Sequence, residues 1–275
     1  RMQQEVRASH ILVLVDEGAS PQDTLKAYNK VLDIKKRLDA GEDFIKVAQQ
    51  FSEDPSVKEN NGDLGYFSAF RMVYPFENAA YKTKSGQISK PFRTRFGYHI
   101  IKVVDKRVNR GEVTVAHIMI LKQNDAAQNE KAKTTIDDIY KKIQQGESFE
   151  SLAQQFSEDK SSSAKGGVLQ RFGSGQLSSE EFENVAFSLQ NKNDISKPFQ
   201  SQFGWHIVKL IDKHPVLSLT DMKNELEEKV RKDERSLLIT NSLAKKLRAK
   251  YPQTKDSKVL ASVKKIITDD FYSQT

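Results

Sequence analysis

The chain contains almost the same eleven-residue segment twice: FGYHIIKVVDK at 96–106 and FGWHIVKLIDK at 203–213. In each copy a histidine, His99 or His206, lies within a run that is apolar on both faces. Such a run is typical of a strand in the centre of a sheet, covered on both sides. We therefore expect a fold with two equivalent central strands, each carrying one histidine.

Three further segments recur at a nearly constant spacing, which indicates two whole domains in tandem rather than a solenoid of short repeats. We expect one domain at 1–107, a second at 108–215 and a helical C-terminal segment at 216–275. The recurring pairs are VRASHILV and TVAHIMIL (6–13 and 114–121), FIKVAQQFSED and FESLAQQFSED (44–54 and 149–159), and two copies of ISKPF (88–92 and 195–199).

Composition narrows the function classes. The 275 residues include no cysteine, which excludes disulfides, thiolate catalysis and cysteine metal sites. The net charge of +7 is spread over many lysines and glutamates, so we expect a solvated surface first and a weak attraction for acidic partners second. We expect no nucleic-acid partner; the competing interpretation, a basic nucleic-acid module, predicts strongly salt-dependent binding to DNA or RNA. No apolar run approaches the roughly 20 residues of a membrane span. The opening RMQQEVRASH is charged and strand-like and resembles no secretory signal, so we expect a fragment of a longer precursor.

Within the first copy the pattern predicts an α+β domain. A β-branched strand carries His10, and an amphipathic helix follows at about 24–40, ended by Gly41. A short helix at 44–51, a polar loop at 52–63, a third helix at YPFENAAY (74–81) and two closing strands complete it.

After Pro215 the pattern predicts one long helix that ends before Pro252. Ser218 and Asp221 form a capping signal at its start. We expect its apolar stripe either to pack on the second domain, or to self-associate or dock an N-terminal region absent from this chain. A further short helix is expected at 257–271. The stripe comprises Leu219, Met222, Leu226, Val230, Leu237 and Leu247.

The paired histidines admit several interpretations. A single histidine on an apolar strand is more often a satisfied core residue than a catalytic one. Two histidines and a loop aspartate present in both copies favour a functional group, although a structural polar network stays open. A metal site ranks low, because no tight H-x-x-x-H spacing occurs. No G-x-S-x-G is present, and the glycines of NNGDLGYF lack the context of a phosphate loop.

The segments SHILV, FSEDPS, GDLGYF, MVYPFE and FGYHIIKV, in this order, resemble the parvulin-type (PpiC or rotamase) peptidyl-prolyl cis/trans isomerases. The resemblance covers about 6–105 and again about 113–212. It implies a four-stranded antiparallel sheet surrounded by helices in each domain, and no cofactor. Tandem parvulin domains with flanking helices further resemble bacterial extracytoplasmic chaperone-isomerases.

That wider resemblance implies a periplasmic or otherwise extracytoplasmic location, with a signal peptide and a helical region before Arg1. The implied partners are unfolded or nascent exported proteins and proline-containing peptides. Some members of the family bind the phosphate of phosphoserine-proline substrates with a basic loop after the first strand. Here that loop is DEGASPQD (16–23), whose acidity predicts unmodified X–Pro substrates.

The resemblance also assigns site residues, with no metal ligand among them. The expected catalytic polar residues are His10, Asp54, Thr94 and His99 in the first copy, and His117, Asp159, Ser201 and His206 in the second. The expected prolyl pockets consist of Leu64, Met72, Phe76 and Phe96, and of Leu169, Leu177, Phe182 and Phe203. For Met72 and Phe76 the competing interpretation is packing of one helix face at i, i+4 spacing.

The second copy departs from the family pattern. Its GGVLQ places Val168 and Gln170 where the first copy has an aspartate and a glycine, and its SSEEF is one residue longer than VYPF. We therefore expect the first domain to carry most of the catalysis, with the second weaker or specialised for binding. The alternative is a non-catalytic peptide-binding chaperone with two degenerate parvulin domains.

Overall fold

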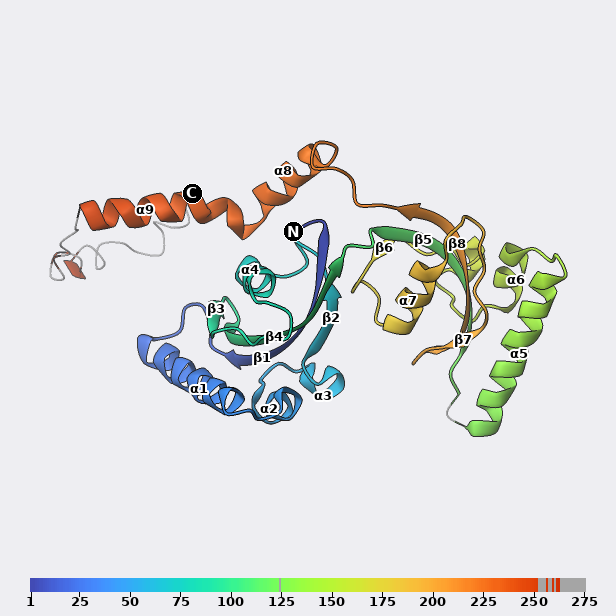
Figure 1. Ribbon diagram of the computed structural model, residues 1–275, viewed down its shortest axis with the longest axis horizontal. Helices are drawn as coiled ribbons and strands as arrows, with labels where there is room; N and C mark the ends of the chain where they lie inside the picture. The colour runs from blue at the N-terminus through green and yellow to red at the C-terminus, as the bar shows by residue number, and fades with distance from the viewer. Residues whose placement is uncertain (124, 252–255, 257–258, 260, 263–275) are drawn as a thin grey trace. The chain divides into compact units, whose positions relative to one another are not determined.

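The computed structural model describes residues 1–123, 125–251, 256, 259 and 261–262. The chain divides into two compact units, one from Arg1 to Lys223 and one beginning at Asn224. The first unit contains two four-stranded antiparallel sheets, ordered β2-β1-β4-β3 and β6-β5-β8-β7 (Figure 1). The predicted α+β class, with one such sheet in each of two domains, is confirmed.

The first domain follows the predicted order with three differences, one of which is the strand β2 at Asp63–Phe67, where the pattern predicted no strand. The first helix begins at Pro21 rather than near Thr24, because the Ser20 hydroxyl caps it by accepting from the Asp23 N–H. The expected polar loop contains a single helical turn, which ends at Asn61 in a left-handed conformation. The elements are β1 Gln4–Leu14, α1 Pro21–Asp39, α2 Phe44–Phe51, α3 Val57–Asn60, β2 Asp63–Phe67, α4 Tyr74–Lys82, β3 Phe92–Thr94 and β4 Gly97–Val108.

Helices cover both faces of the first sheet, which explains why its central strands are apolar throughout (Figure 1). On one face, Ile11 and Ile100 pack against α1 and α2. On the other face, Val6 and Ile101 pack against α4. Because side chains alternate along a strand, His10 and His99 belong to the α4 face.

The second domain repeats this arrangement with a shorter edge strand. In the first domain the Asp63 carboxylate accepts from the Gly65 N–H and helps to shape β2. Val168 and Gln170 replace this pair, and the corresponding β6 has two residues rather than five. The elements are β5 Glu112–Leu121, α5 Ala126–Gln144, α6 Phe149–Phe156, a 3₁₀ turn Ser163–Lys165, β6 Phe172–Gly173, α7 Glu180–Ser188, β7 Phe199–Gln200 and β8 Gly204–His214.

The expectation of one continuous C-terminal helix is wrong. The segment consists of α8 Lys223–Lys232, a 3₁₀ turn Glu234–Leu237 and α9 Leu238–Lys250. The break lies at Asp233, whose backbone is extended and whose carboxylate caps the next turn by accepting from the Arg235 N–H. None of the helices in the described part of the chain is long and apolar enough for a membrane span.

The apolar stripe of the C-terminal segment is largely exposed. Leu219, Leu237 and Leu247 are each about half exposed or more, whereas Met222 is buried. The expected turn at its start is present, since the Ser218 hydroxyl accepts from the Asp221 N–H. What this stripe packs against stays a prediction, and the helix expected at 257–271 falls almost entirely outside the described residues.

A buried glutamate on the site-facing helix fixes the preceding loop in both domains. Glu183 of α7 accepts from the N–H groups of Gly175, Gln176 and Leu177 at 2.9–3.0 Å. Its counterpart Glu77 of α4 accepts from the Phe70 N–H at 2.7 Å. Both glutamates belong to a repeated FEN triplet, a sequence signal that the prediction of the site did not use.

Glu183→Gln is expected to lower the free energy of unfolding of the second domain by about 2 kcal/mol, because three backbone donors lose a charged acceptor. Trp205, the only tryptophan of the sequence, is partly buried against the core of this domain, so its fluorescence during urea unfolding reports on this domain. Glu181→Gln, an exposed change on the same helix, is the control. Equal midpoints for the two variants would contradict the role assigned to Glu183.

Candidate active sites in both domains

The two histidines of the first domain meet across neighbouring strands. In the β1–β4 register, His99 lies opposite Leu12, while His10 lies opposite Ile101. Their rings stack at a centroid distance of 5.8 Å with an interplanar angle of 19°. Both are almost fully buried, at 5% and 4% exposure. The sheet register alone therefore brings together residues 89 positions apart in the chain.

Each imidazole has one polar neighbour. His10 Nε2 lies 2.8 Å from Asp54 Oδ2, although the direction of the contact is not that of a hydrogen bond. His99 Nε2 lies 2.8 Å from Thr94 Oγ1. Since Thr94 Oγ1 already accepts from the Phe96 N–H, its buried hydroxyl proton is available to donate to His99 Nε2.

The second domain reproduces this group closely. Here His117 Nε2 and Asp159 Oδ2 are hydrogen-bonded at 2.7 Å. Ser201 Oγ and His206 Nε2 are 2.8 Å apart. The two rings stack at 5.8 Å and 15°. The substitutions noted in the second copy leave its polar group intact.

Burial sets the protonation states. It lowers the pKa of every histidine in the two pairs, to about 3 for His99 and about 4 for His206. Burial raises the pKa of the two aspartates, but hydrogen bonds reverse this effect, chiefly from Ser56 to Asp54 and from Ser162 to Asp159. Both aspartate pKa values lie below the ordinary range. At neutral pH each site therefore holds two neutral imidazoles beside one carboxylate.

Aromatic rings enclose the first histidine pair on the α4 side. Phe76, 4% exposed, contacts His10 and His99 edge-on at 5.7 and 5.5 Å. Leu64 and Met72 are partly buried against the same cluster. Phe96 is 48% exposed, and its backbone N–H donates to the Thr94 hydroxyl.

The helix-face interpretation of Met72 and Phe76 is wrong. Helix α4 begins at Tyr74, so Met72 lies in the preceding loop and only Phe76 belongs to the helix. The two side chains enter the same cluster from different elements. The i, i+4 spacing is here a coincidence of sequence.

The second domain has a pocket of about 240 Å³ at the same place. This volume suits a small group such as a proline ring better than a drug-sized ligand. All eight residues expected for this domain line it. The complete lining is His117, Met119, Asp159, Leu169, Leu177, Ser178, Ser179, Phe182, Ser201, Phe203 and His206.

Sequence reasoning missed several residues of these sites. Phe92 stacks on His99, and Phe199 stacks on His206, each at 5.4 Å. Both end the repeated ISKPF segment, so a signal was available. Ser56 and Ser161, whose hydroxyls donate to Asp54 and Asp159, each lie two residues after the repeated FSED segment, so a signal was available for them as well. Ser162 donates a further hydrogen bond to Asp159.

No metal centre is formed by the described side chains, since none of their histidine, aspartate and glutamate groups makes a cluster of three suited to an ion. The geometry instead combines a neutral histidine pair, one carboxylate and an apolar pocket. A model of the rotamase family, described as a PPIC-type PPIASE domain, matches residues 10–105 and 117–212. The chain belongs to the PPIC-type PPIase family.

Curated relatives of these PPIC-type domains include proteins named Chaperone SurA. The one from Hahella chejuensis is 35% identical over 214 residues, covering 76% of this chain and 48% of the relative. The one from Nitrosococcus oceani is 34% identical over 209 residues, covering 74% and 48%. The chain thus spans about half the length of the curated relatives it matches. The crystal structure of the peptidylprolyl isomerase PrsA from Bacillus anthracis is 33% identical, covering 53% of this chain and 62% of that one, with a TM-score of 0.34.

The buried histidines predict an acid-sensitive second PPIC-type domain. Because the pKa of His206 is lowered to about 4, only the unfolded chain takes up its proton between pH 6.5 and 4. The free energy of unfolding is therefore highest above pH 6.5. It decreases as the pH falls below 6.5, by up to about 1.4 kcal/mol per pH unit for each such histidine. Asp159, with its pKa lowered, keeps its contribution across this window.

Urea unfolding followed by Trp205 fluorescence from pH 7.5 to 4.5 measures this slope. In His206→Asn, one of the two buried imidazoles of the domain no longer titrates, so the slope should fall by about half. An unchanged slope in that variant would show that other groups cause the acid sensitivity.

Proposed function

We propose that this chain is a peptidyl-prolyl cis/trans isomerase and folding chaperone that acts on unmodified X–Pro bonds of unfolded or exported proteins. The observation that carries the proposal is the same polar group in both domains, beside an apolar cluster in the first domain and an apolar-lined pocket in the second. Membership of the PPIC-type family supports the isomerase part. The relatives named Chaperone SurA support the chaperone part. The proposed location, from the resemblance, is periplasmic or otherwise extracytoplasmic in a bacterium.

Isomerisation breaks no bond, but rotation about the peptide C–N bond has a barrier of about 18–20 kcal/mol. A catalyst must therefore bind the twisted peptide better than either planar form. In the first domain, Leu64, Met72 and Phe76 would hold the proline ring while the preceding carbonyl turns. Because these side chains are apolar, they would hold the ring by packing alone, with no transfer of charge.

The polar group would act on the rotating carbonyl. Loss of amide resonance in the twisted state shifts charge between nitrogen and oxygen, and fixed dipoles can stabilise that shift. In our proposal Asp54 and the neutral rings of His10 and His99 supply this field. Asp54 is not proposed as a nucleophile, since the reaction needs no covalent intermediate.

The first domain is proposed to carry most of the activity. In the intact chain, Met72→Ala should lower kcat/KM for an Ala-Xaa-Pro-Phe peptide by about tenfold, because the pocket loses most of one apolar wall. Leu177→Ala in the second pocket should lower the total rate by less than about twofold, since the first domain still turns over. Leu25→Ala, an exposed change on α1, is the control.

The rival hypothesis, a non-catalytic peptide-binding chaperone, predicts a different result. The isomerisation rate would stay at the uncatalysed level in every protein, while the chain would still suppress aggregation of an unfolded client. A larger loss in Leu177→Ala than in Met72→Ala would instead assign the main activity to the second domain.

A further inference from the structure

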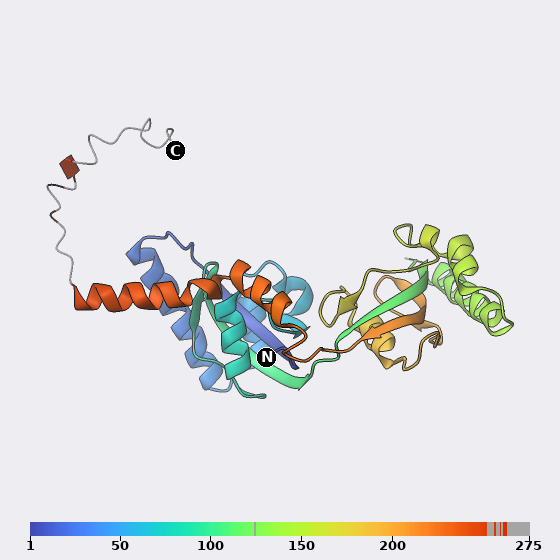
Figure 2. The ribbon, with the colours of Figure 1, turned by 90° about the horizontal axis from the view of Figure 1, so that it is seen from above.

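The loop Ser174–Leu177 contacts both the pocket of the second domain and the backbone of the first domain. Leu177, at its end, lines the pocket of the second domain. Gly175, two residues earlier, lies against the backbone of Tyr66 in β2 of the first domain. Both domains belong to the Arg1–Lys223 unit, and the connection between them is only Asn109–Gly111 (Figure 1, Figure 2). One wall of the second pocket therefore rests on the first domain.

The contact at Gly175 explains why this position is a glycine. Its φ is +73°, but the equivalent residue of the first copy is Phe70, which has a φ of +65°. A left-handed backbone thus does not by itself exclude a side chain here. A Cβ at Gly175 would lie 2.2 Å from the Tyr66 carbonyl oxygen, which no side chain tolerates. Glycine is needed for the approach to the other domain.

Ser174 shows the same kind of difference between the copies. Its equivalent is Ala69, and both are buried. The Ser174 hydroxyl accepts from Arg107 Nη2 at 3.2 Å and from Arg110 Nη2 at 2.9 Å. Arg107 belongs to the end of β4 in the first domain, and Arg110 to the connection. The added hydroxyl is therefore the meeting point of two arginines from outside the second domain.

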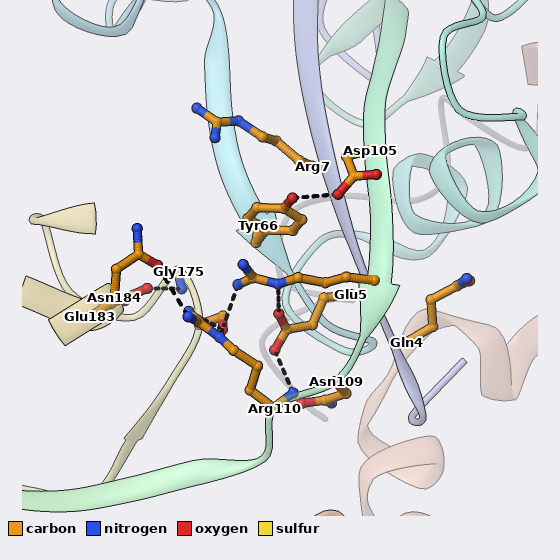
Figure 3. Close-up of polar contacts among 12 residues, drawn as sticks. Gln4, Glu5, Arg7, Tyr66, Asp105, Asn109, Arg110, Gly175, Glu183 and Asn184 are labelled. Atoms are coloured by element: carbon orange, nitrogen blue, oxygen red, sulfur yellow. Dashed lines mark hydrogen bonds and ion pairs between the residues drawn. The ribbon is translucent and has the colours of Figure 1, made fainter. Parts of the chain in front are cut away.

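The arginines are themselves held in the first domain. Arg107 lies 3.5 Å from the Tyr66 ring centroid and donates from Nε to the buried Glu5 carboxylate at 2.7 Å. Glu5, 1% exposed, also accepts from the Arg110 N–H (Figure 3). A buried carboxylate requires such partners, so Glu5 fixes both arginines.

Two further contacts join the same surfaces. Arg110 donates from Nη1 to Asn184 Oδ1 at 3.1 Å (Figure 3). Its guanidinium also lies 4.1 Å from the Phe187 ring centroid. Arg7 of β1 pairs with Glu180, the first residue of α7, at 3.0 Å. The helix that bears the pocket residue Phe182 is thus contacted from the connection and from the first domain.

We propose that the first domain and the connection position the wall of the second pocket: Tyr66, Arg107 and Arg110 hold the loop Ser174–Leu177, and through Leu177 they set the peptide affinity of the second domain. This inference rests on the proposed function of that pocket. Tyr66, Arg107 and Arg110 are positioning residues, since none of them lines the pocket. The loop of the first copy, with Ala69 and Phe70, lacks the hydroxyl and the glycine that make this contact.

The test uses the intact, isotope-labelled chain and two variants that disturb the junction alone. Gly175→Asn introduces the Cβ that would meet Tyr66, while asparagine still tolerates the left-handed backbone of this position. Ser174→Ala, the residue of the first copy, removes only the shared hydroxyl. Gly146→Asn is the control, because Gly146 of the second domain also has a positive φ, whereas a Cβ there meets nothing within 4 Å.

Two measurements are made by NMR on each protein. Hydrogen exchange of the Leu177 N–H, which donates to Glu183, should become about fivefold faster in Gly175→Asn, since the loop loses its contact with the first domain while Glu183 remains. Titration with an Ala-Ala-Pro-Phe peptide gives a separate Kd for each domain, from the amide signals of Leu64 and Leu169. The Kd of the second domain should rise about 3- to 10-fold in Gly175→Asn and less in Ser174→Ala, with that of the first domain unchanged.

Trp205 fluorescence establishes that the second domain of each variant is folded before these values are compared. Unchanged Leu177 exchange and unchanged Kd in both junction variants would overturn the proposal. If neither domain of the unaltered chain binds the peptide, the proposed function is wrong, while faster Leu177 exchange in the variants would still establish the positioning of the loop. An equal loss of affinity in both domains would also overturn the proposal, since it assigns the effect to the second pocket.

Discussion

The antiparallel pairing of β1 with β4, repeated by β5 with β8, is the constraint on which both sites depend. It places His99 opposite Leu12 and so sets its ring beside that of His10. A shift of the register by one residue would turn one histidine to the opposite face of the sheet. The hydroxyl and carboxylate partners come from loops, but they have a group to contact only because this register brings the imidazoles together.

Burial of the histidine pair determines its chemistry. Desolvation keeps both rings neutral, and hydrogen bonds from neighbouring serines keep the nearby carboxylate ionised. A site with one fixed negative charge and two polarisable neutral rings can influence a rotating dipole without exchanging protons. The same burial opposes folding in acid, so the electrostatics of the site and the stability of the domain have a common origin.

The two copies share their sites and differ at their contact. The polar group, the stacked rings and the buried glutamate of the site-facing helix occur in both domains. The changes from Ala69 to Ser174 and from Phe70 to Gly175 provide a hydroxyl and an open space where the second domain meets the first. The polar group is thus common to both copies, while the junction involves the loop that forms one wall of the second pocket.

The tandem α+β architecture and the central strands followed from the amino-acid sequence, because each depends on local periodicity or on a repeated segment. The sixteen expected site residues came from the resemblance to the parvulin-type family and not from the pattern itself. The position of β2, the stacking of Phe92 on His99 and the break at Asp233 were not predicted, since they depend on which side chains face one another. The roles of Glu5 and Gly175 emerged only from the folded chain. The role of a buried carboxylate or of a missing Cβ depends on the groups that surround it, and those groups come from elements that are far apart in the chain.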